Sequence, residues 1–157
     1  MPTYPAKWAA IRATGFWCID LADPEDPVLI QSLRVPGLGP ISRVRAPGNF
    51  DLEVEVAGSL LLVAGGGRLS AINIIDLGRA ELVVSLFATE DAVHVVWDGR
   101  LAVVSGGDLT LFDASVQPRV VRLRTIETPG DARGVFVRDA IAYVADSGAG
   151  LTIIRLQ

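Results

Sequence analysis

The stretch DAVHVVWDGRLAVVSGGDLTLFD, from Asp91 to Asp113, decides the fold of this chain because it recurs. Forty residues later, DARGVFVRDAIAYVADSGAGLTII runs from Asp131 to Ile154 with the same order of apolar segments and breaks. An earlier and more divergent copy runs from Leu52 to Asp76. A repeat of this length is usually one supersecondary unit that buries its apolar faces only against its neighbours. We therefore expect stacked repeating units.

Each copy contains short apolar segments rich in Val, Ile and Leu, bounded by Gly, Asp or Pro, which is the pattern of β-strands. Glycines such as Gly65-Gly66-Gly67 and Gly106-Gly107 separate the second segment from the third, where a hairpin needs positive φ. The second segments, such as Leu60 to Ala64, are almost continuously apolar, as strands covered on both faces are. No window shows a helical period over ten residues, so we expect little helix.

A fourth segment follows the third, as in Leu82 to Phe87 and Val120 to Ile126. A partial copy also opens the chain, in which Trp8 to Ala13, Phe16 to Asp20 and Val28 to Leu33 match the second, third and fourth segments. Four short strands in about forty residues is the composition of a propeller blade. The sequence therefore predicts an all-β β-propeller of four-stranded antiparallel blades, with about three to four repeats per chain.

The 157 residues suit one compact repeat domain. The expected units are a partial repeat at about 8–37, an insertion at about 38–46, repeats at about 47–89 and 90–130, and a partial repeat at about 131–157.

These segments resemble the LVIVD repeat family, a β-propeller-type repeat. The naming pentapeptide is similar to Leu109–Asp113, Phe16–Asp20 and Ile72–Asp76, whereas the last copy carries Arg155 where Asp is expected. The following turn of the family resembles Asp20–Pro27. The resemblance covers nearly the whole chain except about residues 38–46 and implies a fold. It implies no particular function, because no shared active site accompanies the repeat.

The net charge of −4 and the lack of a Lys/Arg cluster argue against binding to nucleic acid or to anionic lipid. Lys7 and Arg12 flank too few apolar residues for a signal peptide, and no apolar run approaches the roughly 20 residues that span a bilayer. We expect the chain as given to be cytoplasmic. If it is a fragment of a longer protein, a secreted or cell-surface location is the alternative.

Catalytic motifs are scarce. The chain has one histidine, His94, and one cysteine, Cys18, which cannot build a Ser/His/Asp triad or a Cys/His metal cluster by themselves. Gly65-Gly66-Gly67-Arg68 lacks the Gly-Lys-Ser/Thr ending of a phosphate-binding loop. We expect no cofactor and no metal. The scarcity of catalytic motifs argues against an enzyme but does not decide whether the protein is one.

One group of polar residues could form a site. If the first segment is the innermost strand, its first residues crowd around a mouth of the central channel, with Glu53, His94 and Gly134 at equivalent positions. Asp91, Asp131 and Arg133 lie close by in the sequence. By analogy with other propellers, Glu53, Asp91, His94, Asp131 and Arg133 are a candidate ligand-binding site. The alternative is a set of ordinary polar rim residues.

The leading functional hypothesis is a non-enzymatic binding or scaffold module that mediates protein–protein interaction or self-assembly. The alternative is a small-ligand-binding or enzymatic propeller, or a fragment of one, that uses the channel mouth. We expect the large aromatic side chains to pack between blades, with a partner-binding role for one or two as the alternative; these residues are Trp8, Trp17, Phe50, Trp97 and Phe136.

The expected partner is a protein or a second copy of the chain, because an open arc of blades leaves apolar faces and strand edges in water. A homodimer would complete a propeller, and two complete and two partial repeats per chain suggest a six-bladed ring with composite blades. A four-bladed monomer and a truncated chain are the alternatives.

Overall fold

The computed structural model describes residues 6–10, 15–35 and 52–156. Within these ranges it contains fourteen β-strands, two 3-10 turns (η1, Leu77–Arg79; η2, Ser147–Ala149) and no α-helix. The strands are β1 (Ala6–Ala10), β2 (Gly15–Asp20), β3 (Val28–Arg34), β4 (Leu52–Ala57), β5 (Leu60–Gly65), β6 (Arg68–Asn73), β7 (Glu81–Phe87), β8 (His94–Trp97), β9 (Leu101–Gly106), β10 (Asp108–Asp113), β11 (Val121–Ile126), β12 (Gly134–Arg138), β13 (Ile141–Ala145) and β14 (Leu151–Arg155). The expected all-β fold is confirmed.

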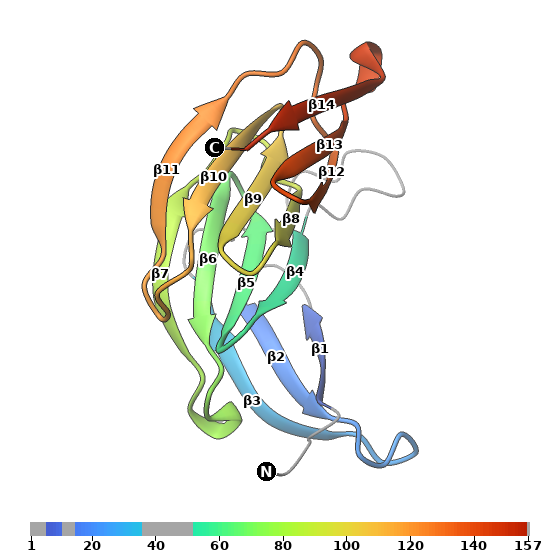
Figure 1. Cartoon of the computed structure of the whole chain (residues 1–157). Coiled ribbons are helices and arrows are strands. Elements are labelled where there is room, and N and C mark those ends of the chain that lie inside the picture. Colours follow the sequence, from blue (N-terminus) through green and yellow to red (C-terminus); the bar gives the residue numbers. More distant parts are fainter. Residues whose placement is uncertain (1–5, 11–14, 36–51, 157) are drawn as a thin grey trace.

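Strands that follow one another in the chain pair antiparallel and form four sheets. The first sheet is β1-β2-β3, the second β4-β5-β6-β7, the third β8-β9-β10-β11 and the fourth β12-β13-β14. The sheets stack as a curved row, with the first and the fourth at opposite ends (Figure 1). The insertion expected at about 38–46 lies outside the described residues.

The pairing registers show that the sheets are copies of one unit. In the second, third and fourth sheets, a residue near the end of the second strand lies opposite an equivalent leucine of the third strand. The pairs are Ala64 with Leu69, Ser105 with Leu109 and Ala145 with Leu151. Each pairing of a third strand with a fourth strand also contains a register shift at the same place: between Cys18 and Ile19, Ala71 and Ile72, and Leu111 and Phe112. This shared β-bulge increases the local twist where the third strand pairs with the fourth strand in each of these three sheets.

One predicted segment is wrong by three residues. The third strand of the second sheet ends at Asn73, so its counterpart of Leu109–Asp113 is Leu69–Asn73, not Ile72–Asp76. Asn73, like Asp20 and Asp113, accepts the N–H group two residues further on, at 2.8–3.2 Å. Asp76 instead caps η1 by accepting the N–H of Gly78. The register follows from the hairpin at Gly66-Gly67, where both residues have positive φ.

The second strands of the second and third sheets are covered on both faces, as their apolar sequences predict. Every residue of β5 and β9 is buried. On β9, Ala102 and Val104 join the core cluster shared with the second sheet, while Leu101 and Val103 join the cluster shared with the fourth sheet. Alternate side chains of one strand thus pack against opposite neighbours, because successive side chains point to opposite faces of a sheet.

Two glutamines also connect neighbouring sheets. Gln31 of β3 bonds both to the N–H and to the carbonyl of Ala80, at 2.8 and 2.9 Å. Gln117 bonds to the backbone of Ser59 and Ala57, at 2.7 and 2.6 Å. Each amide satisfies backbone groups at the end of the adjacent sheet, so the row of sheets is held by hydrogen bonds as well as by apolar contact.

Candidate functional site

The predicted channel-mouth residues Glu53 and His94 do meet. They lie at equivalent positions of β4 and β8, since Glu53 lies opposite Ala64 and His94 lies opposite Ser105. The Nδ1 atom of His94 contacts the Oε2 atom of Glu53, and its Nε2 atom lies 2.9 Å from the carbonyl oxygen of Val135. A carbonyl can only accept a hydrogen bond, so Nε2 carries a proton. One histidine therefore connects the first strands of three successive sheets.

The predicted residues Asp131 and Arg133 form a separate pair. The Nη2 and Nε atoms of Arg133 donate to Oδ2 of Asp131 at 2.6 and 3.0 Å, and both side chains are nearly half exposed. The hydroxyl of Ser105 donates to the Arg133 carbonyl at 3.0 Å. The side chains of this pair satisfy each other in water, where such an ion pair contributes little to stability.

Asp91 lies in the loop before β8 and lines an open hollow with Asp108 and Arg122, where the second and third sheets meet. Its backbone carbonyl lies so close to Gly106 that a Cβ atom there would be 1.9 Å from it. Gly106 is therefore required by this close approach. The structure thus places the five predicted residues in two contacting pairs and one loop position.

Asp146 is a buried carboxylate, and it has a full set of partners. Its oxygens accept from the hydroxyls of Thr128 and Thr152, both at 2.9 Å, and from the N–H of Gly130 at 3.1 Å. Three donors compensate for its burial: two lie in the segment that joins the third sheet to the fourth, and the third lies on β14. Within the described residues, no group of three or more His, Cys, Asp and Glu side chains is placed to hold a metal ion.

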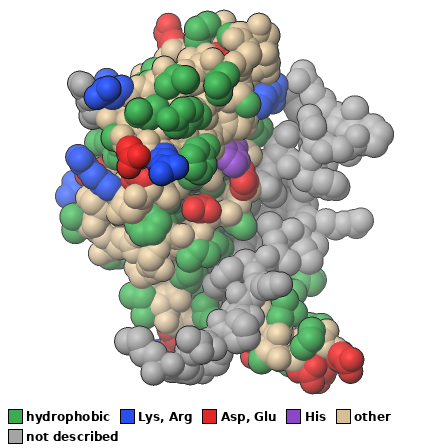
Figure 2. Space-filling model, turned by 45° about the vertical axis from the view of Figure 1, so that its right-hand side comes forward, with side chains coloured by type: hydrophobic (Ala, Val, Ile, Leu, Met, Phe, Trp, Pro, Cys, Tyr) green, Lys and Arg blue, Asp and Glu red, His purple; other side chains and the backbone are tan. Residues whose placement is uncertain are grey.

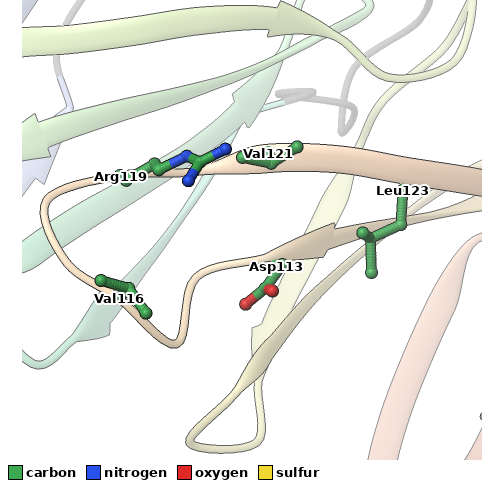
Figure 3. A pocket seen from close by; sticks show the side chains of 5 residues that line it. All are labelled: Asp113, Val116, Arg119, Val121 and Leu123. Atoms are coloured by element: carbon green, nitrogen blue, oxygen red, sulfur yellow. The ribbon is translucent and has the colours of Figure 1, made fainter.

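A shallow hollow of about 150 Å³ lies at the hairpin between β10 and β11, lined by Asp113, Val116, Arg119, Val121 and Leu123 (Figure 3). The hydroxyl and the N–H of Ser115 both donate to Asp113, and these bonds lower the pKa of the Asp113 carboxyl. The N–H bond belongs to the strand-end turn that Asp20 and Asn73 also form, so it is explained by the repeat, and the hydroxyl bond is a local addition at Ser115.

The outer face of the fourth sheet is apolar and exposed. Phe136, Leu151 and Ile153 are 60–66% exposed, and Tyr143 lies between them with its ring centroid 6.3 Å from that of Phe136. Figure 2 shows hydrophobic side chains gathered in the upper part of the molecule, where this sheet lies. A contiguous apolar patch of this kind marks an interaction site more often than scattered apolar residues do.

The prediction that aromatic side chains pack between blades therefore holds only in part. Trp97 packs against the core cluster between the second and third sheets. Phe136 is exposed, and Trp17 on the outer face of the first sheet is 42% exposed. The side chains of Trp8 and Phe50 lie outside the described residues. Aromatic composition could not separate these cases, because the terminal sheets use the same residue types as the interior ones.

Stacked antiparallel sheets of up to four strands, repeating at about forty residues and covering each other's faces, define a β-propeller-type repeat protein. Residues 129–154 match the family model of the LVIVD repeat, which confirms there the resemblance inferred from the sequence. This stretch contains β12, β13 and most of β14. A comparison with curated proteins gives no match. Among the described residues, no helix is long and apolar enough to cross a bilayer.

Proposed function

We propose that this chain is a non-enzymatic binding module that uses the outer face of β12–β14 to contact a protein surface. One observation carries the proposal. Leu109 and Leu111 on β10 are 0–1% exposed, whereas Leu151 and Ile153, which hold the equivalent positions on β14, are 66% and 60% exposed. The fourth sheet thus carries the apolar residues that are buried in the third sheet, but nothing in the described part of the chain covers them.

The edge of β14 supports the same proposal. In the second and third sheets the third strand pairs with a fourth strand, but within the described residues β14 pairs only with β13. Its outward backbone groups are therefore available to an added strand. An apolar face next to an open strand edge suits a protein partner, because apolar burial and backbone hydrogen bonds can both contribute to binding.

The channel-mouth residues favour a structural role over ligand binding. Both ring nitrogens of His94 have partners, and Arg133 is paired with Asp131. A ligand would have to displace either the His94 contacts that join neighbouring sheets or the local ion pair of Arg133 with Asp131. The small-ligand hypothesis therefore gains no support from the geometry of Glu53, His94, Asp131 and Arg133.

A photo-crosslinking experiment tests the proposed face. The photoreactive residue p-benzoylphenylalanine replaces Leu151, and in a control it replaces Leu123, which is 50% exposed on β11. We expect a discrete protein adduct from position 151 that is lost when Ile153→Asp is introduced into the same photoreactive chain. Adducts of equal yield from both positions, or none from position 151, would reject the proposal.

A further inference from the structure

The two end faces of the row of sheets are different faces of the same repeat. On the third sheet, Val103 and Leu111 face the fourth sheet, whereas Val104 faces the second. On the outer face of the fourth sheet, Leu151 and Ile153 hold the positions that Leu109 and Leu111 hold on the third sheet. This outer face therefore has the side-chain pattern that, in the third sheet, packs against the following sheet.

The outer face of the first sheet corresponds to the face that, in the other sheets, packs against the preceding sheet. Trp17 pairs with Ser32 in the register in which Thr110 pairs with Thr125 in the third sheet. The hydroxyl of Thr110 is buried against the preceding sheet, where it donates to the Ala88 carbonyl. Trp17 and Leu29, in contrast, are 42% and 53% exposed. This face has the pattern that, elsewhere, is covered by the preceding sheet.

The charges at the two ends are complementary. Arg155 ends β14 at the position that Asp20, Asn73 and Asp113 occupy in the other sheets, since it lies opposite Ile141 as Asp113 lies opposite Leu101. The first sheet continues from Asp20 into an acidic turn that also contains Asp23, Glu25 and Asp26. Figure 2 shows these acidic side chains gathered at the far end of the molecule from the fourth sheet. Neighbouring sheets pack face to face about 10 Å apart. A first sheet stacked on a fourth sheet in the orientation of the repeat therefore places Arg155 on the same side of the stack as this acidic turn.

We infer that the partner of the β12–β14 face is the first sheet of a second copy of this chain, bound head to tail. The inference rests on the proposed function and names its partner. Two curved rows of four sheets, each placing its fourth sheet on the first sheet of the other, close a two-fold ring of eight sheets, within the four to eight blades usual for propellers. The composite six-bladed ring would need β3 to leave β2, to which it is paired over its whole length.

A complementation experiment tests the direction of this contact. Ile153→Asp alters the fourth-sheet face, Leu29→Asp alters the first-sheet face, and Leu123→Asp is a control of similar exposure on β11. Trp17→Asp is a second first-sheet variant in case Leu29→Asp does not fold, and circular dichroism checks the folding of each. Sedimentation and native mass spectrometry at micromolar concentration then report the mass.

We expect dimers for the wild type and for Leu123→Asp, and monomers for each face variant alone. An equimolar mixture of Ile153→Asp and Leu29→Asp should contain mixed dimers only, because one of the two junctions then joins two unaltered faces. A monomeric wild type, or an assembly larger than two, would overturn the inference. A dimer lost in Ile153→Asp but kept in Leu29→Asp would replace it with contact between two fourth sheets and leave the proposed function intact. A dimer kept in Ile153→Asp would overturn both.

Discussion

Leu111 and Ile153 occupy equivalent positions, so truncating each to alanine measures what a covering sheet contributes at that place. Leu111 is 1% exposed in the core cluster between the third and fourth sheets. Truncation of a buried leucine costs about 2–5 kcal/mol, because the transfer free energy is lost and a cavity remains. Ile153 is 60% exposed. Since full burial of such a side chain contributes about 1.5–3 kcal/mol, its truncation in an uncovered sheet should cost about 1 kcal/mol or less.

Urea denaturation followed by circular dichroism gives both values, with the slope m checked against the wild type. At submicromolar protein concentration we expect Leu111→Ala to lower the free energy of unfolding at least twice as much as Ile153→Ala. At tens of micromolar, the cost of Ile153→Ala should rise towards that of Leu111→Ala, because a second molecule then covers the face. Equal costs at the lowest concentration would refute the assignment of Ile153 to an uncovered face.

Three further predictions concern single side chains. Val103→Asp should prevent folding, because an unpaired buried carboxylate costs several kcal/mol out of a total stability of about 5–15 kcal/mol. Asp23→Ala, in an exposed turn, should change the free energy of unfolding by about 0.5 kcal/mol or less. Equal thermal melts for the two variants would contradict this. Burial, together with the charge of nearby Asp20, raises the pKa of the Cys18 thiol. Cys18 should therefore react with a disulfide reagent at pH 8 only after denaturation. Rapid reaction of the native protein would count against the burial of Cys18. The pKa of Asp113 is lowered in the folded protein, so the stabilisation from its ionised form is present above the ordinary carboxyl pKa and lost as the pH falls through the folded value. Ser115→Ala removes the hydroxyl donor and should raise this pKa, which carboxyl ¹³C shifts measure. An unchanged titration would show that the hydroxyl bond is unimportant.

The candidate site was predictable as a set of equivalent positions but not as a set of contacts. The repeat alignment placed Glu53, His94 and Gly134 at the start of equivalent strands, and the pairing registers agree. That His94 bridges Glu53 and the Val135 carbonyl depends on how closely three sheets approach one another. No spacing along the chain determines that distance, because it is set by the side chains that pack between the sheets.

The sequence by itself determined the strands, their order and most of their registers, because glycine-containing turns and short apolar segments restrict each repeat to local antiparallel pairing. It failed at Ile72–Asp76, where Ile-Ile-Asp resembles the motif more closely than the actual strand Leu69–Asn73, which contains the polar Ser70 and the small Ala71. Only the tertiary structure decided which apolar faces are covered. Leu109–Phe112 and Leu151–Ile154 look alike in sequence, yet one strand is buried and the other has an exposed face. An apolar pattern predicts that a strand will form and bury one side, but the surface that covers it belongs to the neighbouring sheet.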